Sequence, residues 1–173
     1  IPGEFSAEQD WEAYAECEKL VVFSAMPHGE FASRLPGLEL AWEQAGILPK
    51  LTVIDLSGDF RLRDERAYEE AYHMQHPCPE HLSRWVYGLS EWNRPQIRKA
   101  TRIANPGCFA TAMALAMAPL IQLGVGRVSV FGITGSSGSG ATPTEVTHHP
   151  TRDGDFRAYK MLRHQHEYEV RQV

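Results

Sequence analysis

The chain has 173 residues, 43% of them hydrophobic, and its 17 lysine and arginine residues against 22 aspartate and glutamate residues give a formal net charge of -5. These charges are interspersed, so there is no basic surface for a nucleic acid, and no apolar run reaches the roughly 20 residues that a membrane helix needs. The three cysteines, Cys17, Cys78 and Cys108, are too widely spaced for a disulfide framework, so we expect a globular cytoplasmic protein with no nucleic-acid or membrane partner.

Two short apolar runs predict strands that are buried on both faces. The first spans residues 20–25 and stops at Pro27-His28-Gly29, and the second spans residues 51–56. We expect a helix between them, from about residue 28 to residue 44, and a third, shorter strand over residues 102–104. Strands that are separated by helical stretches favour a parallel sheet with crossover connections, which is the α/β class.

The stretch from Asp64 to Asn93 is polar, rich in histidine and proline, and shows little periodicity. We therefore expect surface structure there, or an elaboration on the substrate side. It also contains residue types that bind zinc, which keeps a small zinc module open as a weaker alternative, although cysteine pairs with zinc-site spacing are missing. These residues are His73, His76, Cys78 and His81, and the pair His148-His149 is a second, equally weak candidate.

Residues 110–123 follow the break at Asn105-Pro106-Gly107 and are dense in alanine, methionine and leucine. They predict a helix whose apolar residues occupy most faces, so deep burial is expected. Residues 127–134 are rich in valine, phenylalanine and isoleucine and predict a further strand, which a glycine-rich loop over residues 135–140 follows. From Tyr159 onwards we expect a helical or mixed segment.

Cys108 stands directly after the Pro106-Gly107 turn, at the first turn of the predicted helix. Unpaired backbone N–H groups and the positive end of the helix dipole gather there, which favours the nucleophilic thiolate and can stabilise an oxyanion. A buried structural cysteine is the alternative. A thiol nucleophile also needs a proton partner, and the candidates are His164 and His166, with Glu169 three residues further on. In an extended segment both histidines share one face, whereas in a helix only one of them can reach the site.

Several motifs resemble, in the same order, those of the N-acetyl-gamma-glutamyl-phosphate reductase family of arginine biosynthesis. The most specific one is Asn105-Pro106-Gly107-Cys108-Phe109-Ala110-Thr111, which resembles the active-site motif of that family. Further stretches are similar to the family's Pro-His-Gly strand end, its Asp-Leu-Ser-Ala-Asp-Phe-Arg-Leu and Tyr-Gly-Leu-Pro-Glu motifs, its glycine-rich loop and its His-Arg-His motif. These are residues 23–29, 55–62, 87–91, 134–140 and 164–170.

The departures from the family pattern leave the cysteine and both histidines in place. Phe109-Ala110 replaces the commoner Tyr-Pro, Gly58 replaces alanine and Tyr168 replaces proline. The glycine-rich turn that holds the cofactor pyrophosphate does not occur before Leu20, and the family continues well past the two histidines. We therefore interpret the sequence as an internal fragment that is inactive by itself.

The resemblance implies a domain organisation. Residues 1–105 correspond to the end of a Rossmann-like dinucleotide-binding domain with a parallel sheet. Residues 106–173 correspond to the start of a catalytic domain like that of glyceraldehyde-3-phosphate dehydrogenase, with an α+β arrangement.

The resemblance also implies a reaction, namely NADPH-dependent reduction of an N-acyl-L-glutamyl 5-phosphate to the semialdehyde and phosphate, in an enzyme that is a dimer or tetramer. Cys108 would attack the acyl carbon to form a thioester, and His166 would be the acid/base, with His164 as the alternate. No metal is implied. Binding roles are implied for Arg61, Asn105 and His164 at the substrate, and for Pro27, His28, Gly29, Ser137 and Gly138 at the NADP cofactor.

Two other activities remain open at this point. A related reductase of lysine biosynthesis acts on a carrier-bound aminoadipyl phosphate, and the sequence does not exclude that substrate. A cysteine hydrolase would use Cys108, a histidine and an acid such as Glu169, since the same thiol and base can transfer an acyl group to water.

Overall fold

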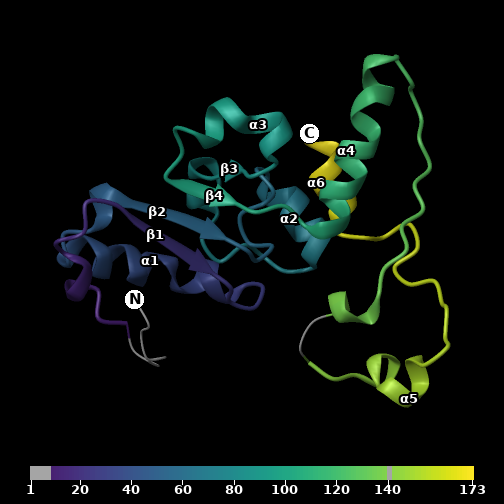
Figure 1. Cartoon of the computed structure of the whole chain (residues 1–173), viewed down its shortest axis with the longest axis horizontal. Helices are drawn as coiled ribbons and strands as arrows, with labels where there is room; N and C mark the ends of the chain where they lie inside the picture. Colours follow the sequence, from purple (N-terminus) through teal and green to yellow (C-terminus); the bar gives the residue numbers. More distant parts are fainter. Residues whose placement is uncertain (1–8, 140–141) are drawn as a thin grey trace.

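The computed structural model describes residues 9–139 and 142–173, and its centre is a sheet of four parallel strands (Figure 1). The strand order is β1-β2-β4-β3, and every neighbouring pair is parallel. The predicted α/β class is confirmed. The strands are β1 (Leu20–Ser24), β2 (Leu51–Asp55), β3 (Val86–Tyr87) and β4 (Arg102–Ala104).

Helices connect the strands and continue beyond the last one. The α-helices are α1 (Glu30–Gln44), α2 (Glu65–Tyr72), α3 (Ser90–Ile97), α4 (Cys108–Gln122), α5 (His149–Arg152) and α6 (His166–Arg171). Short 3-10 helices occur at η1 (Glu12–Tyr14), η2 (Leu48–Lys50), η3 (Pro79–Arg84), η4 (Ser136–Ser139) and η5 (Glu145–Thr147). Among the described residues, no helix is long and apolar enough to cross a membrane.

One face of the sheet packs against α1 and forms the main core. Alternate residues of β2, Leu51 and Val53, point into this core, where they meet Phe31, Leu35 and Trp42 of α1. This alternation is the period of two that a strand imposes on its side chains.

The other face of β1 remains open. Val21 and Phe23 are 51% and 63% exposed. The prediction that this strand is buried on both faces is therefore wrong within residues 9–139 and 142–173, because no element among them covers these two side chains.

The stretch from Asp64 to Asn93 is more than surface structure, so that prediction is wrong, whereas its alternative, an elaboration on the substrate side, stays a prediction. It contains α2, η3 and β3, and it buries large aromatic side chains, among them Tyr68, Trp85 and Tyr87. The ring of Trp85 stacks on Phe60 with 4.3 Å between the ring centroids. These aromatic residues are irregularly spaced because they come from short elements and turns, so no period of 2 or 3.6 marks them in the sequence.

The same stretch does not gather a zinc site. His76 hydrogen-bonds through Nε2 to the carbonyl of Asp59 at 2.9 Å, and its Nδ1 accepts the backbone N–H of Cys78 at 3.1 Å. Burial raises the pKa of the Cys78 thiol to about 12, and the thiol donates to the carbonyl of Ala32. No group of three metal-ligating side chains converges within the described part of the chain.

Helix α4 forms where it was predicted, but its expected deep burial is wrong. Ala110 and Ala114 are its buried residues, whereas Leu115 and Ile121 are exposed. Helix α4 packs against the six-residue helix α6, which covers one side of it. An apolar composition on most faces predicts burial only where neighbouring elements supply the cover.

The strand predicted over residues 127–134 does not form. These residues are irregular, and Phe131 and Ile133 are 100% and 81% exposed. Figure 1 shows the stretch between α4 and α6 running away from the sheet. A strand needs a neighbour to pair its N–H and C=O groups, and the described residues supply none here.

A buried turn follows β2 and is held by hydrogen bonds among its own residues. The Asp55 carboxylate accepts the backbone N–H of Ser57 at 3.0 Å and its hydroxyl at 2.7 Å, and that hydroxyl accepts the N–H of Asp59 at 3.1 Å. Burial is the main cause that raises the pKa of Asp55 to about 6, against these hydrogen bonds from Ser57, which lower it.

This raised pKa predicts a pH dependence of stability that Asp55→Asn should remove. The folded state binds the proton more tightly than the unfolded state, so the free energy of unfolding should fall as pH rises from about 4 to about 6. The shift corresponds to a loss of about 3 kcal/mol in wild type relative to the variant. Urea unfolding at several pH values measures it. The exposed control Asp153→Asn should behave as wild type, and an identical pH dependence in Asp55→Asn would contradict the assignment.

Candidate active site

Polar side chains follow the carboxyl ends of three neighbouring strands, which meet at one edge of the sheet. His28 comes after β1, Asp59 after β2 and Cys108 after β4. In open α/β sheets, ligands bind at this edge.

Cys108 is the first residue of α4 and is exposed, so its predicted position at a helix start is confirmed. Gly107 precedes it in an extended conformation, and the N–H of Thr111 closes the first turn on the Gly107 carbonyl at 2.9 Å. The N–H groups of Cys108 and Phe109 belong to the part of the helix that has no intrahelical acceptors. They are therefore the amides that can meet a developing oxyanion beside the thiol.

The Glu169 carboxylate on α6 has no solvent exposure and joins three distant segments. Its Oε2 accepts the Tyr87 hydroxyl and the Gly107 N–H, both at 2.9 Å. Its Oε1 accepts Nη1 of Arg61 at 3.2 Å. Three donors, one of them cationic, compensate the cost of burying this carboxylate. The Gly107 N–H is consequently not free to stabilise an oxyanion.

The His166 ring lies against the residue that precedes Cys108. A Cβ atom added at Gly107 would overlap this ring, at 2.6 Å from Cε1. The Nε2 atom of His166 is 3.7 Å from Oε1 of Glu169, whereas its buried Nδ1 has no hydrogen-bond partner among the described residues.

His164 lies beside His166, with 4.5 Å between the ring centroids. His164 precedes α6 and His166 is its first residue, so the segment changes conformation between them and both rings reach the same place. Phe109 packs edge-on against both rings.

Both histidines are neutral at pH 7. Burial is the main cause that lowers the pKa of each to about 4; the neighbouring His166 adds to the effect on His164, and Arg61 adds to the effect on His166. A neutral imidazole can accept a proton, so either ring can serve as a base at neutral pH.

Arg61 connects the turns after β2 and β4. Its Nε donates to the carbonyl of Asn105 at 2.8 Å, its Nη2 to that of Leu56 at 3.0 Å, and its Nη1 to Glu169. Each guanidinium nitrogen already has an acceptor, and two of the five N–H groups remain for a ligand. The Asn105 side chain is exposed and donates to the carbonyl of Pro106 at 3.2 Å. Substrate binding by Arg61 and Asn105 stays a prediction.

The turn at Pro27, His28 and Gly29 leads into α1, and a carboxylate already accepts two of the N–H groups at this helix start. The Asp59 carboxylate accepts Gly29 N at 2.6 Å and Ala32 N at 2.9 Å, and it lies 2.8 Å from Nδ1 of His28. Burial tends to raise the pKa of Asp59, but these hydrogen bonds hold it below its usual value. A phosphate at the start of α1 would be repelled by this carboxylate. Contact between the cofactor and residues 27–29 therefore stays a prediction, and it would not use the helix N-terminus.

Ser137 and Gly138 lie in η4, on the stretch that leaves the sheet, and both are exposed. Figure 1 shows this stretch well separated from the turn before α1, so the structure does not bring the two predicted cofactor segments together. Gly140, the last residue of the expected loop, lies outside the described residues.

Two residues of the site carried no chemical signal in the sequence. Gly107 has no side chain and so leaves room for the His166 ring, and the Tyr87 hydroxyl donates a hydrogen bond to Glu169. Tyr87 belongs to the stretch 87–91 that resembles a family motif, but its hydrogen-bond partner is 82 residues away. Only a signal of long-range pairing would have found it.

Residues 5–100 match the family described as "Semialdehyde dehydrogenase, NAD binding domain", and residues 108–173 match "Semialdehyde dehydrogenase, dimerisation domain".

Curated relatives cover nearly the whole chain. It is 44% identical over 161 residues to the N-acetyl-gamma-glutamyl-phosphate reductase of Bacillus mycoides, with 91% of this chain and 44% of that protein covered. The reductase of the same name from Methanopyrus kandleri is 42% identical over 170 residues, with 98% and 47% covered. The [LysW]-L-2-aminoadipate 6-phosphate reductase of Deinococcus radiodurans is 41% identical over 162 residues, with 91% and 44% covered. The chain spans less than half the length of these relatives.

The contact between Gly107 and His166 predicts a specific effect of Gly107→Ala. The added methyl group should push the ring out of its buried place, so the pKa of His166 should rise from about 4 towards its ordinary value of 6.5. NMR titration of the histidine side chains measures this change. The matched control is Gly126→Ala, where an added Cβ meets nothing within 4 Å. An unchanged His166 titration in Gly107→Ala would show that the ring does not occupy this place.

Proposed function

The chain belongs to the semialdehyde dehydrogenase family, and from this premise we propose that it is part of an NADPH-dependent acyl-phosphate reductase. The proposed reaction converts an N-acyl-L-glutamyl 5-phosphate into the semialdehyde and phosphate, in arginine biosynthesis in the cytoplasm. The observation that carries the proposal is the buried Glu169 carboxylate, which holds the turn before Cys108 and faces His166. The names of the relatives from Bacillus mycoides and Methanopyrus kandleri support this substrate.

The first step uses Cys108 and His166. Because Nε2 of His166 faces Glu169, the tautomer with a proton on Nε2 leaves a lone pair on Nδ1. Nδ1 is buried and bonded to no group among the described residues, so in this proposal the ring turns before Nδ1 accepts the thiol proton. The imidazolium that forms is then stabilised by the carboxylate, as in a catalytic triad. The thiolate attacks the acyl carbon, the bond from that carbon to the phosphate oxygen breaks, and phosphate leaves with the bonding electrons. The product is a thioester on Cys108.

The second step needs a hydride, which NADPH supplies when it is bound. His166 holds the proton that left Cys108 and returns it as the carbon–sulfur bond breaks and the semialdehyde leaves. The N–H groups of Cys108 and Phe109 stabilise the oxyanion that forms in each step.

The match of residues 5–100 to an NAD binding domain supports a cofactor site in this chain. We place Pro27, His28, Gly29, Ser137 and Gly138 beside the cofactor, with the boundary between the two domains at residues 105 and 106. The start of α1 is unfavourable for the pyrophosphate, because the Asp59 carboxylate already accepts the N–H groups of Gly29 and Ala32 there.

A second candidate substrate comes from the comparison with Deinococcus radiodurans. The relative there is named for a carrier-bound aminoadipate phosphate and is about as similar to this chain as the glutamyl-phosphate reductases are. The same cysteine and histidine chemistry serves both substrates, so they differ in what binds the rest of the molecule.

The test is phosphate-dependent NADP reduction by the intact protein with N-acetylglutamate semialdehyde and with the carrier-bound aminoadipate semialdehyde. Cys108→Ala should lower turnover by about 10⁴-fold or more, because the covalent step is lost. The control Cys17→Ala changes an exposed thiol outside the proposed site and should keep wild-type turnover. We expect no turnover from residues 1–173 alone. Release of acid from the acyl phosphate without nucleotide would instead indicate the cysteine hydrolase.

The two histidines should separate in kinetics. His166→Gln should lower kcat by about 10² to 10⁴-fold, since it removes the base, whereas His164→Gln should mainly raise KM for the acyl phosphate. Steady-state kinetics on the intact protein distinguishes them. The reverse pattern would exchange the two roles.

A further inference from the structure

Tyr87 is a buried residue of the edge strand β3, and the proposed mechanism gives it no role. Its hydroxyl donates to Oε2 of Glu169 at 2.9 Å, the same oxygen that accepts the Gly107 N–H at 2.9 Å. Because both donors use Oε2, the other oxygen, Oε1, faces Arg61 at 3.2 Å and His166 at 3.7 Å. The hydroxyl of Tyr87 thus helps to decide which carboxylate oxygen the imidazole meets.

The backbone of Tyr87 is fixed to the strand that leads to Cys108. Tyr87 pairs with Ala104 in the parallel register of β3 and β4, and the N–H of Gly88 donates to the Ala104 carbonyl at 2.8 Å. The chain then turns through residues 105–107, and the Gly107 N–H meets the carboxylate that the Tyr87 hydroxyl also meets. Tyr87 therefore contacts both ends of this turn. Its backbone pairs with Ala104 before the turn, and its hydroxyl shares the Glu169 carboxylate with the Gly107 N–H at the end of the turn.

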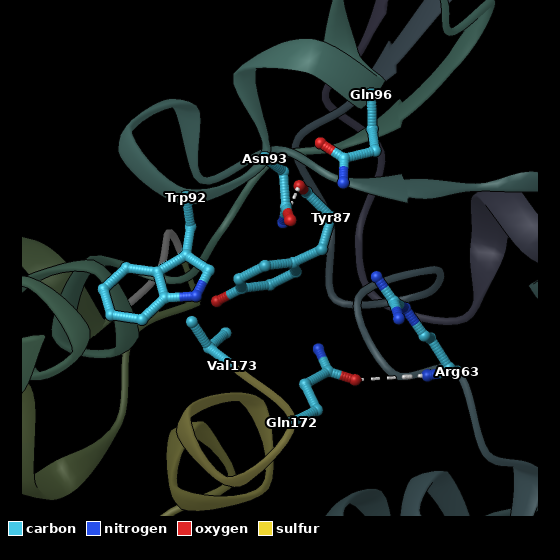
Figure 2. Close-up of a pocket in the computed structure, with 7 residues that line it drawn as sticks. All are labelled: Arg63, Tyr87, Trp92, Asn93, Gln96, Gln172 and Val173. Carbon is cyan, nitrogen blue, oxygen red and sulfur yellow. Dashed lines mark hydrogen bonds between the residues drawn. The ribbon is translucent and has the colours of Figure 1, made fainter. Parts of the chain in front are cut away.

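A cavity of about 190 Å³ lies beside the Tyr87 ring on the side of α3 (Figure 2). Figure 2 shows Trp92 and Val173 beside the hydroxyl end of the Tyr87 ring, and the amide of Asn93 donates to the Tyr87 carbonyl at 2.9 Å. The ring packs with Leu89, Ala114 and Val173, and the hydroxyl is the polar atom of this side chain that reaches Glu169.

We propose that Tyr87 is a positioning residue of the active site, which acts through Glu169 to hold the Cys108 turn and the His166 ring in their working arrangement. This inference rests on the proposed function of Cys108 and His166. Tyr87 touches neither the thiol nor the imidazole, so its effect must pass through the carboxylate.

Other charged and titratable groups also face Glu169 and His166, and they remain in place when the Tyr87 hydroxyl is removed. Arg61 comes from the turn after β2, Tyr72 from α2, and His164 and Lys160 from the stretch before α6. A change of Tyr87 to phenylalanine therefore alters the orientation of the carboxylate without adding or removing a charge at neutral pH.

The test is the alkylation of Cys108 by iodoacetamide in Tyr87→Phe, without any ligand. Peptide mass spectrometry gives the rate for Cys108 relative to the exposed Cys17 in the same molecule. At pH 7 this ratio should fall about 3- to 10-fold, which corresponds to the free energy of one hydrogen bond. The pH profile of Cys108 alkylation should move to higher pH. The matched control is Tyr68→Phe, which removes another buried tyrosine hydroxyl, bonded to His28 at 3.2 Å. Tyr68→Phe should lower the melting temperature similarly and leave the ratio unchanged.

A double-mutant cycle shows whether the effect passes through Glu169. In a Glu169→Gln background, Tyr87→Phe should change the alkylation ratio by less than about 1.5-fold, because the charged acceptor is already gone. A ratio that is unchanged or raised in Tyr87→Phe, or a full effect that persists in the Glu169→Gln background, would overturn the inference. Since this test needs neither cofactor nor turnover, its result is independent of whether Cys108→Ala abolishes reduction.

Discussion

The burial of the Glu169 carboxylate is the constraint on which the rest of the site depends. A carboxylate without solvent contact is costly unless donors meet both oxygens, and here the donors come from Arg61, Tyr87 and Gly107, which are 62 to 108 residues away in the chain. They can meet only after the sheet has formed and α6 has docked. Helix α6 has six residues, too few to be stable alone, so the same contacts also hold the helix in place. Folding and assembly of the site are therefore one event.

A second buried carboxylate, Asp59, plays a corresponding part at α1 and explains why two helix starts at the same sheet edge differ. The N-cap of α1 is Gly29, which has no side chain and a φ of 84°, so a residue from the turn after β2 caps the helix instead. The positive end of α1 is thereby neutralised by the protein itself. At α4 the capping carboxylate reaches only Gly107, and the following amides stay beside Cys108. A carboxylate thus caps the start of α1, whereas at α4 the amides of Cys108 and Phe109 remain for the oxyanion of the proposed mechanism.

The sequence predicted the features that depend on neighbouring residues in the chain. The strands β1 and β2, helix α1 and the position of Cys108 at a helix start follow from apolar runs and from the Pro106-Gly107 turn, and all of them are present. The predictions that were wrong concern features that depend on which other elements of the fold pack against the segment. Burial of α4, pairing of residues 127–134 and the surface character of residues 64–93 are decided by the presence or absence of a neighbouring element. The partners of Glu169 were out of reach for the same reason, since no local pattern links Tyr87 or Gly107 to it.

The protonation state of His166 follows first from its burial and second from the cations beside it. A carboxylate 3.7 Å from an imidazole would ordinarily raise the pKa of the imidazole. Burial, followed by the positive charges of Arg61 and Lys160, outweighs this effect and lowers the pKa to about 4. His166 is therefore neutral at pH 7, and in the proposed mechanism the carboxylate stabilises the ring most when the ring has gained a proton. Tyr87, Gly107 and Arg61 already hold the Glu169 carboxylate in place, so it need not move when the imidazole becomes charged. In this sense the proposed site is preorganised before a substrate binds.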